Sequence, residues 1–114
     1  MNTDTQIENE LRDLFLKIEA KLNYRPTVLI DMIEKYGGLK TVKCLIDRPE
    51  PSPGYKKLAK LDELDFTVEM LLLEHEEWHS LFKYDTIMTA VRRINQTTKD
   101  RKLALQLSHP ENTI

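Results

Sequence analysis

Apolar residues recur every three to four positions along most of the chain, which is the spacing of one face of an α-helix. The first stripe begins at residues 5–8, Thr-Gln-Ile-Glu, where Thr5 and Glu8 have the spacing of a helix-capping box. The stripe consists of Ile7, Leu11, Leu14, Phe15, Ile18 and Leu22. It predicts an amphipathic helix, with Glu8 and Arg12 placed to pair on its solvent-exposed side.

A second stripe is followed by two glycines. It consists of Val28, Leu29, Met32, Ile33 and Tyr36. Pro26 suits the first turn of this helix, and the glycine pair 37–38 is expected to end it. Residues 39–46 then predict a short third helix, with Lys40 and Lys43 on its outer side.

The second half of the chain begins with a loop. Residues 48–54 contain three prolines and a glycine, which remove backbone donors and fix φ. Three more apolar stripes follow, and each predicts a helix. They are Tyr55, Leu58 and Ala59; Val68 with residues 70–73; and Ile87, Met88, Val91 and Ile94 after a possible cap at Asp85. Trp78, Leu81 and Phe82 are expected to pack on the core near a turn.

The pattern changes at Asn95. A polar run leads to Leu103, Leu105 and Leu107, whose spacing of two fits no helical stripe. We therefore expect a helical domain over residues 1–94 and a polar, mobile tail over residues 95–114. No segment alternates convincingly over the length of a strand. The predicted fold is all-α: a compact single domain of six or seven short helices with a loosely attached C-terminal tail.

Composition agrees with one such domain. The chain has 114 residues, of which 40% are hydrophobic and 32% charged, and its longest apolar run is residues 70–73. A membrane span needs about 20 apolar residues, so no membrane insertion is expected. The N-terminus shows no signal-peptide pattern and Cys44 is the single cysteine, which together favour a cytoplasmic protein without disulfides.

The charges divide into two blocks although the net charge is only −2. Residues 35–60 are mainly basic and residues 61–85 mainly acidic, so either block is a candidate surface for a partner. The candidate basic face consists of Lys40, Lys43, Arg48, Lys56, Lys57 and Lys60. The candidate acidic face consists of Glu69, Glu74, Glu76 and Glu77.

Residues 75–79, His-Glu-Glu-Trp-His, match the H-E-x-x-H pattern of zinc hydrolases. On one continuous helix His75 and His79 would lie one turn apart and could chelate a metal. A catalytic zinc needs a third protein ligand, however, and the remaining histidine, His109, lies in the predicted tail. The acidic flanks also favour a solvated segment. His75 and His79 are therefore weak metal candidates, and we expect no cofactor.

The helices on either side of the glycine pair also invite a helix-turn-helix interpretation, in which the second helix reads DNA. The fit is partial, because a position that should be apolar falls on Lys43 and the second helix is short. Nucleic-acid binding through the basic block remains an alternative to protein binding.

Several separated segments resemble a group of small, uncharacterised bacterial proteins. They are residues 36–39 (Tyr-Gly-Gly-Leu), 44–46, 52–55, 64–69 (Leu-Asp-Phe-Thr-Val-Glu) and 81–82. The resemblance covers about residues 24–94, and implies no activity. In the group's pattern the place of residues 75–79 is a short acidic and aromatic connection without a histidine pair.

These observations favour a non-catalytic helical interaction module or inhibitor that binds another macromolecule, most simply another protein. A nucleic-acid-associated protein is the alternative, and a zinc-dependent hydrolase is the third.

Overall fold

The computed structural model describes residues 3–108, which are largely helical and contain no strand. The elements are α1 (Thr3–Leu22), α2 (Thr27–Ile46), α3 (Pro53–Lys60), the 3-10 helix η1 (Leu64–Phe66), α4 (Val68–Glu74), the 3-10 helix η2 (Glu76–Leu81) and α5 (Tyr84–Ser108). The predicted all-α single domain is confirmed. None of the helices within residues 3–108 combines the length and the apolar character needed to cross a bilayer.

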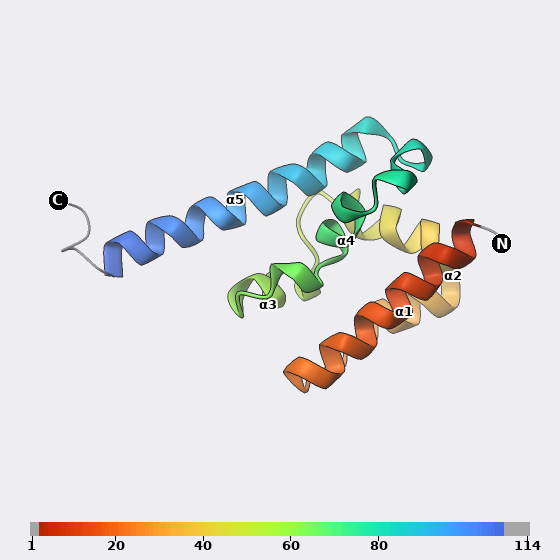
Figure 1. Ribbon diagram of the computed structural model, residues 1–114, viewed down its shortest axis with the longest axis horizontal. Coiled ribbons are helices and arrows are strands. Elements are labelled where there is room, and N and C mark those ends of the chain that lie inside the picture. The colour runs from red at the N-terminus through yellow and green to blue at the C-terminus, as the bar shows by residue number, and fades with distance from the viewer. Residues whose placement is uncertain (1–2, 109–114) are drawn as a thin grey trace.

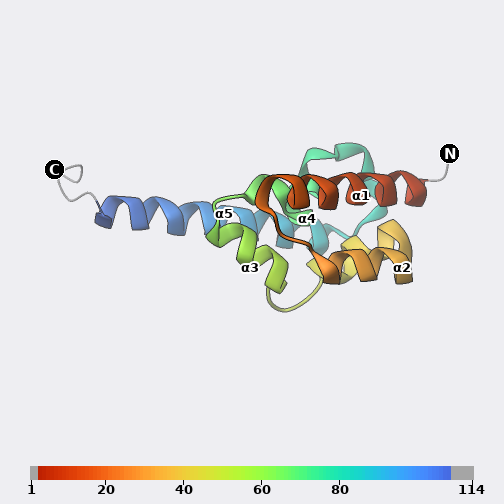
Figure 2. The same ribbon diagram turned by 90° about the horizontal axis from the view of Figure 1, so that it is seen from below.

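Helices α1 and α2 lie side by side (Figures 1 and 2), and both contribute buried apolar residues to the core. The predicted stripe of α1 is buried at Ile7, Leu11, Leu14 and Ile18. Helix α4 and the first half of α5 pack over this pair and bury Leu72 and Ala90. Not every predicted apolar position is buried, because Val28 stays 57% exposed and Leu81 38% exposed.

The glycine pair produces a kink within α2, whereas the sequence predicted that a helix would end there and a separate short helix would follow. Gly37 has a φ of 79°, a left-handed conformation that side chains other than glycine rarely adopt. At Gly38 a Cβ atom would lie only 2.4 Å from the backbone nitrogen of Glu8 on α1. The Leu39 N–H then donates to Asp4 Oδ1 at 2.7 Å, which caps the second half of α2.

Side-chain caps begin two of the short helices. Ser52 Oγ accepts from the Tyr55 N–H at 3.1 Å at the start of α3, and Thr67 Oγ1 accepts from the Met70 N–H at 3.1 Å at the start of α4. The capping box predicted at Thr5 is wrong, because α1 already includes Thr3 and Thr5 lies inside the helix.

Helix α5 continues well beyond the residue where the sequence pattern broke. It is helical from Tyr84 to Ser108, and its second half projects away from the other helices (Figures 1 and 2). Residues 98–106 are exposed, and this half extends the molecule to 55 Å along its longest axis. Thus residues 95–108 are helical rather than irregular, and the rest of the predicted tail lies outside the described residues.

Candidate functional site

A groove of about 1000 Å³ lies between α3 and α5. Tyr55, Lys56, Ala59 and Lys60 line it from α3. Arg92, Arg93, Lys99, Arg101 and Ala104 are among the residues that line it from α5. Cationic side chains therefore stand on both walls, with small or aromatic groups between them.

Some of these cations are paired within the chain and others are not. Lys56 Nζ lies 3.7 Å from a Glu50 carboxylate oxygen, and Arg101 Nε lies 3.0 Å from one of Asp62. Within residues 3–108, Lys60 and Lys99 form no ion pair, and Arg92 donates only to the neutral Thr89 hydroxyl at 3.1 Å. Asp100 adds one carboxylate to the α5 wall, where it accepts from Gln96 Nε2 at 2.8 Å. Lys60, Arg92 and Lys99 form no ion pair with it, so each wall still carries a cation without an acidic partner.

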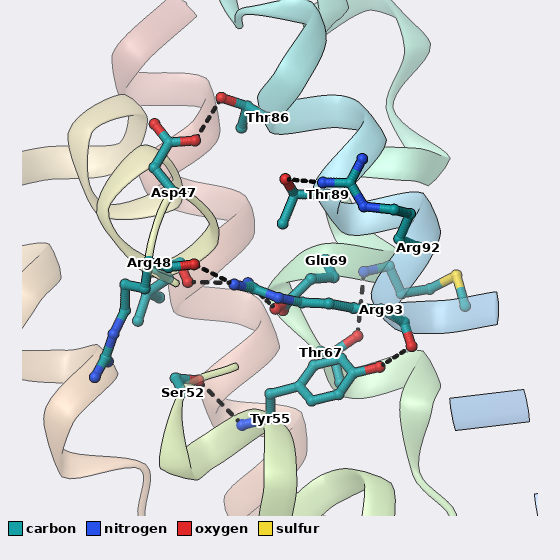
Figure 3. Close-up of polar contacts among 12 residues, drawn as sticks. Asp47, Arg48, Ser52, Tyr55, Thr67, Glu69, Thr86, Thr89, Arg92 and Arg93 are labelled. Carbon is teal, nitrogen blue, oxygen red and sulfur yellow. Dashed lines mark hydrogen bonds and ion pairs between the residues drawn. The ribbon is translucent and has the colours of Figure 1, made fainter. Parts of the chain in front are cut away.

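A buried hydrogen-bond network holds α3 against α5 at the groove (Figure 3). The Tyr55 hydroxyl donates to the Arg93 carbonyl at 2.8 Å and shares a 2.7 Å hydrogen bond with Thr97 Oγ1. Burial raises the pKa of the Tyr55 hydroxyl, which keeps the group protonated and able to donate. These bonds therefore fix the spacing of the two walls at the part of α5 that contains Arg93 and Thr97.

The Arg93 guanidinium joins three segments beneath the groove (Figure 3). Its Nη1 lies 3.0 Å from Glu69 Oε2 on α4, and it also donates to the Leu45 carbonyl at 3.3 Å and, through Nη2, to the Arg48 carbonyl at 2.6 Å. Nearby, Thr86 Oγ1 donates to Asp47 Oδ1 at 2.6 Å. The end of α2 and the loop after it are thereby attached to α4 and α5.

Glu69 is not part of an exposed acidic face, contrary to the sequence-based expectation. Its exposed fraction is 2%, and that of its partner Arg93 is 8%. Desolvation raises the pKa of the Glu69 carboxyl, while the hydrogen bond and charge of Arg93 act in the opposite direction. The other three predicted residues of this face, Glu74, Glu76 and Glu77, are exposed.

The residues of the predicted basic face lie in different environments and do not form one surface. Lys56 and Lys60 line the groove. Lys40 Nζ lies 4.8 Å from the centre of the Tyr36 ring, and Lys57 Nζ lies 4.0 Å from that of the Tyr24 ring. Lys43 is half-buried, and the Arg48 side chain is exposed.

The sequence interpretation missed the contribution of α5 to the groove. Arg92 and Lys99 are seven positions apart, which is close to two helical turns and places both on one side of a helix. This signal was present, but it became meaningful only once residues 95–108 proved to be helical.

The two histidines of the H-E-x-x-H segment do not form a metal-binding pair. Helix α4 ends at Glu74, and His75 takes a non-helical conformation between α4 and η2. Its ring stacks on Trp78 at 4.0 Å between ring centres, and its Nδ1 lies 2.6 Å from a Glu77 carboxylate oxygen. His79 Nε2 instead lies 2.8 Å from the Leu72 carbonyl. No group of three or more metal-ligating side chains occurs within the described part of the chain.

The helix-turn-helix interpretation also lacks geometric support. A recognition helix presents its N-terminal residues to the bases. In this fold the N-terminus of the second half of α2 is covered by α1, where Asp4 Oδ1 accepts from Leu39 N–H and the α1 backbone approaches Gly38. An acidic residue of the protein therefore occupies the end that would face DNA.

The chain matches no protein-family model, no curated protein and no solved structure. The groove and its charges are therefore the basis for a functional assignment.

Proposed function

We propose that the protein is a helical interaction module that binds an acidic segment of another protein in the groove between α3 and α5. The observation that carries the proposal is the uncompensated positive charge of Lys60, Arg92 and Lys99 on the two walls. An acidic segment would satisfy these charges from both sides. The proposal places this interaction in the cytoplasm.

The groove favours a helical partner segment. Both walls are helices, and the described residues offer no strand edge for an extended peptide to join, which favours binding of a helix in the groove. The α5 wall of the groove runs from Arg92 to Ala104, so a partner helix that lies along it would be about three turns long.

The chemistry of the lining predicts the side chains of the partner. Pro51, Ala59 and Ala104 supply small apolar surface between the cationic residues. A matching helix would carry a narrow apolar stripe flanked by Asp or Glu on both sides. This pattern distinguishes an amphipathic acidic helix from a polyanion such as DNA, which offers no apolar stripe.

A direct test uses a synthetic amphipathic peptide of about 16 residues, with Leu at helical spacing and Glu on both flanks. We expect the fluorescently labelled peptide to bind the full chain, and binding to weaken as the salt concentration rises from about 0.05 M to about 0.5 M. The double variant Lys60→Glu/Lys99→Glu should weaken binding by about ten-fold. Fluorescence anisotropy measures each affinity.

The matched control is Lys17→Glu/Lys102→Glu, which changes the net charge equally at exposed positions outside the groove lining. Equal losses of affinity in the two double variants would show a non-specific charge effect and refute the groove as the site. A peptide with the same composition but without helical spacing should bind less well. Binding of a short DNA duplex that exceeds peptide binding and is lost in the groove variant would assign the site to nucleic acid instead.

A further inference from the structure

A second, smaller cavity also lies against α3 and shares Tyr55 with the groove between α3 and α5. It has a volume of about 90 Å³, and the α1–α2 turn, the loop before α3 and η1 all contribute to its lining. Leu29, Leu45, Leu58 and Val68 give it apolar walls. Val28 both lines the cavity and is 57% exposed, so the cavity reaches the surface at that residue.

The size and lining of the cavity define what can enter. One water-sized group needs about 10–15 Å³ of such space, so the cavity accepts roughly six to nine groups of that size. Glu69 also lines it, but its carboxylate is already bonded to Arg93. No buried side-chain polar atom of the described residues lacks a hydrogen-bond partner. The buried part of a ligand should therefore be small and apolar.

Two lysines lie close to aromatic residues of the cavity lining. Tyr24 and Phe66 belong to the lining, and each has a lysine ammonium group over its ring. Lys57 Nζ lies 4.0 Å from the Tyr24 ring centre, and Lys21 Nζ lies 5.3 Å from the Phe66 ring centre. Lys21 Nζ also forms an ion pair with Glu63, 3.4 Å from its Oε2, whereas Lys57 forms no ion pair within residues 3–108. Lys57 therefore has no acidic partner and lies next to Tyr24, one of the lining residues.

We infer that this cavity binds a small monocarboxylate, with its short apolar body among Leu29, Leu45 and Val68 and its carboxylate near Lys57. The site shares Tyr55 with the groove between α3 and α5, but Leu29, Leu45 and Val68 belong to the cavity alone, so the inference does not depend on the proposed protein partner. Burial of about five methylene groups predicts a dissociation constant on the order of 1 mM. The predicted class of ligand is a short-chain aliphatic acid.

Hexanoate is the probe for this site. We expect a saturable titration of the full chain, followed by NMR, in which the methyl signals of Val28, Leu29, Leu45 and Val68 shift together. Lys57→Ala should weaken hexanoate binding by roughly two- to five-fold. Val28→Trp should abolish binding, because a large side chain at this exposed position blocks the mouth without entering the core.

Lys35→Ala is the matched control, since Lys35 Nζ also lies over an aromatic ring, 5.2 Å from the Tyr36 ring centre, but away from the cavity. It should leave the hexanoate affinity unchanged. Hexanol tests the role of the carboxylate and should bind wild type more weakly than hexanoate, with no response to Lys57→Ala. The inference is overturned if the cavity methyl signals do not shift, or if hexanoate binds Val28→Trp as tightly as wild type.

Discussion

Gly37 and Gly38 are adjacent, and each is required for a different steric reason. Gly37 provides a positive φ, whereas Gly38 lets the α1 backbone approach to a distance that any Cβ would obstruct. Both requirements arise at the same bend of α2. A substitution at either glycine should therefore disturb the α1–α2 pair, but for separate reasons.

Gly38→Ala should destabilise the fold by about 1–3 kcal/mol or more, because the new methyl group would meet rigid α1 backbone rather than a flexible side chain. Gly54→Ala is the control, since the nearest heavy atom to its new Cβ is Ser52 Oγ at 3.9 Å. The control should change the free energy of unfolding by no more than about 1 kcal/mol. Urea denaturation measures both, and equal stabilities for the two variants would contradict the close approach at Gly38.

Glu69 and Arg93 form a charge pair whose members depend on each other. Glu69→Ala should lower the free energy of unfolding by about 3–5 kcal/mol, because it leaves the Arg93 cation buried without its counter-ion. Glu74→Ala, at an exposed position on the same helix, should change it by less than about 0.5 kcal/mol. Guanidinium denaturation at constant pH measures the difference.

The double variant Glu69→Leu/Arg93→Met distinguishes the contribution of the Glu69–Arg93 ion pair to stability from that of the other Arg93 hydrogen bonds. Removing both charges should restore part of the stability lost in Glu69→Ala. It should remain below wild type by about 1–3 kcal/mol, because the Leu45 and Arg48 carbonyls lose their donor. Full recovery would show that those two hydrogen bonds contribute nothing.

At the scale of elements, the break between α4 and η2 decides the role of the histidines. His79 follows α4 in sequence and returns to its last turn, where its Nε2–H donates to the Leu72 carbonyl. The Leu72 carbonyl also accepts from the His75 N–H at 3.3 Å, so His79 adds a second hydrogen bond at the C-terminal end of α4. His79 is therefore a capping residue in this structure.

His79→Ala should lower the free energy of unfolding by about 0.5–1.5 kcal/mol, and this loss should be the same with and without added zinc. Glu76→Ala, within the same segment but exposed, serves as the control. Thermal unfolding followed by circular dichroism makes the comparison. A loss of stability that appears only in the presence of zinc would instead assign His79 to a metal site.

Helix positions were predictable where apolar periodicity was regular. The stripe from Ile7 to Ile18 is such a local signal, and it is confirmed although the capping box predicted at Thr5 is wrong. The second half of α5 was missed because its leucines do not form a stripe. Its other residues, however, include many strong helix formers and no Gly or Pro before residue 109, a signal that depends on propensity rather than pattern.

At the scale of the whole molecule, the site could not be read from the sequence. Glu69 looks like one member of an acidic block, and only the packing of α4 on α5 brings it to Arg93, 24 positions away. The groove likewise combines Lys60 with Lys99 through the placement of α3 beside α5. Charge blocks along the chain therefore indicated which residues were polar, but not which of them shared a surface.

The projecting half of α5 makes one wall of the groove sensitive to the helix–coil equilibrium. A helix without tertiary packing is marginal in water at a length of about 12–15 residues, although the anchored first half supplies its nucleus. A ligand that contacts Lys99 would add the packing that this wall lacks. Binding would then be coupled to ordering, and its affinity could be tuned by residues of α5 that never touch the partner.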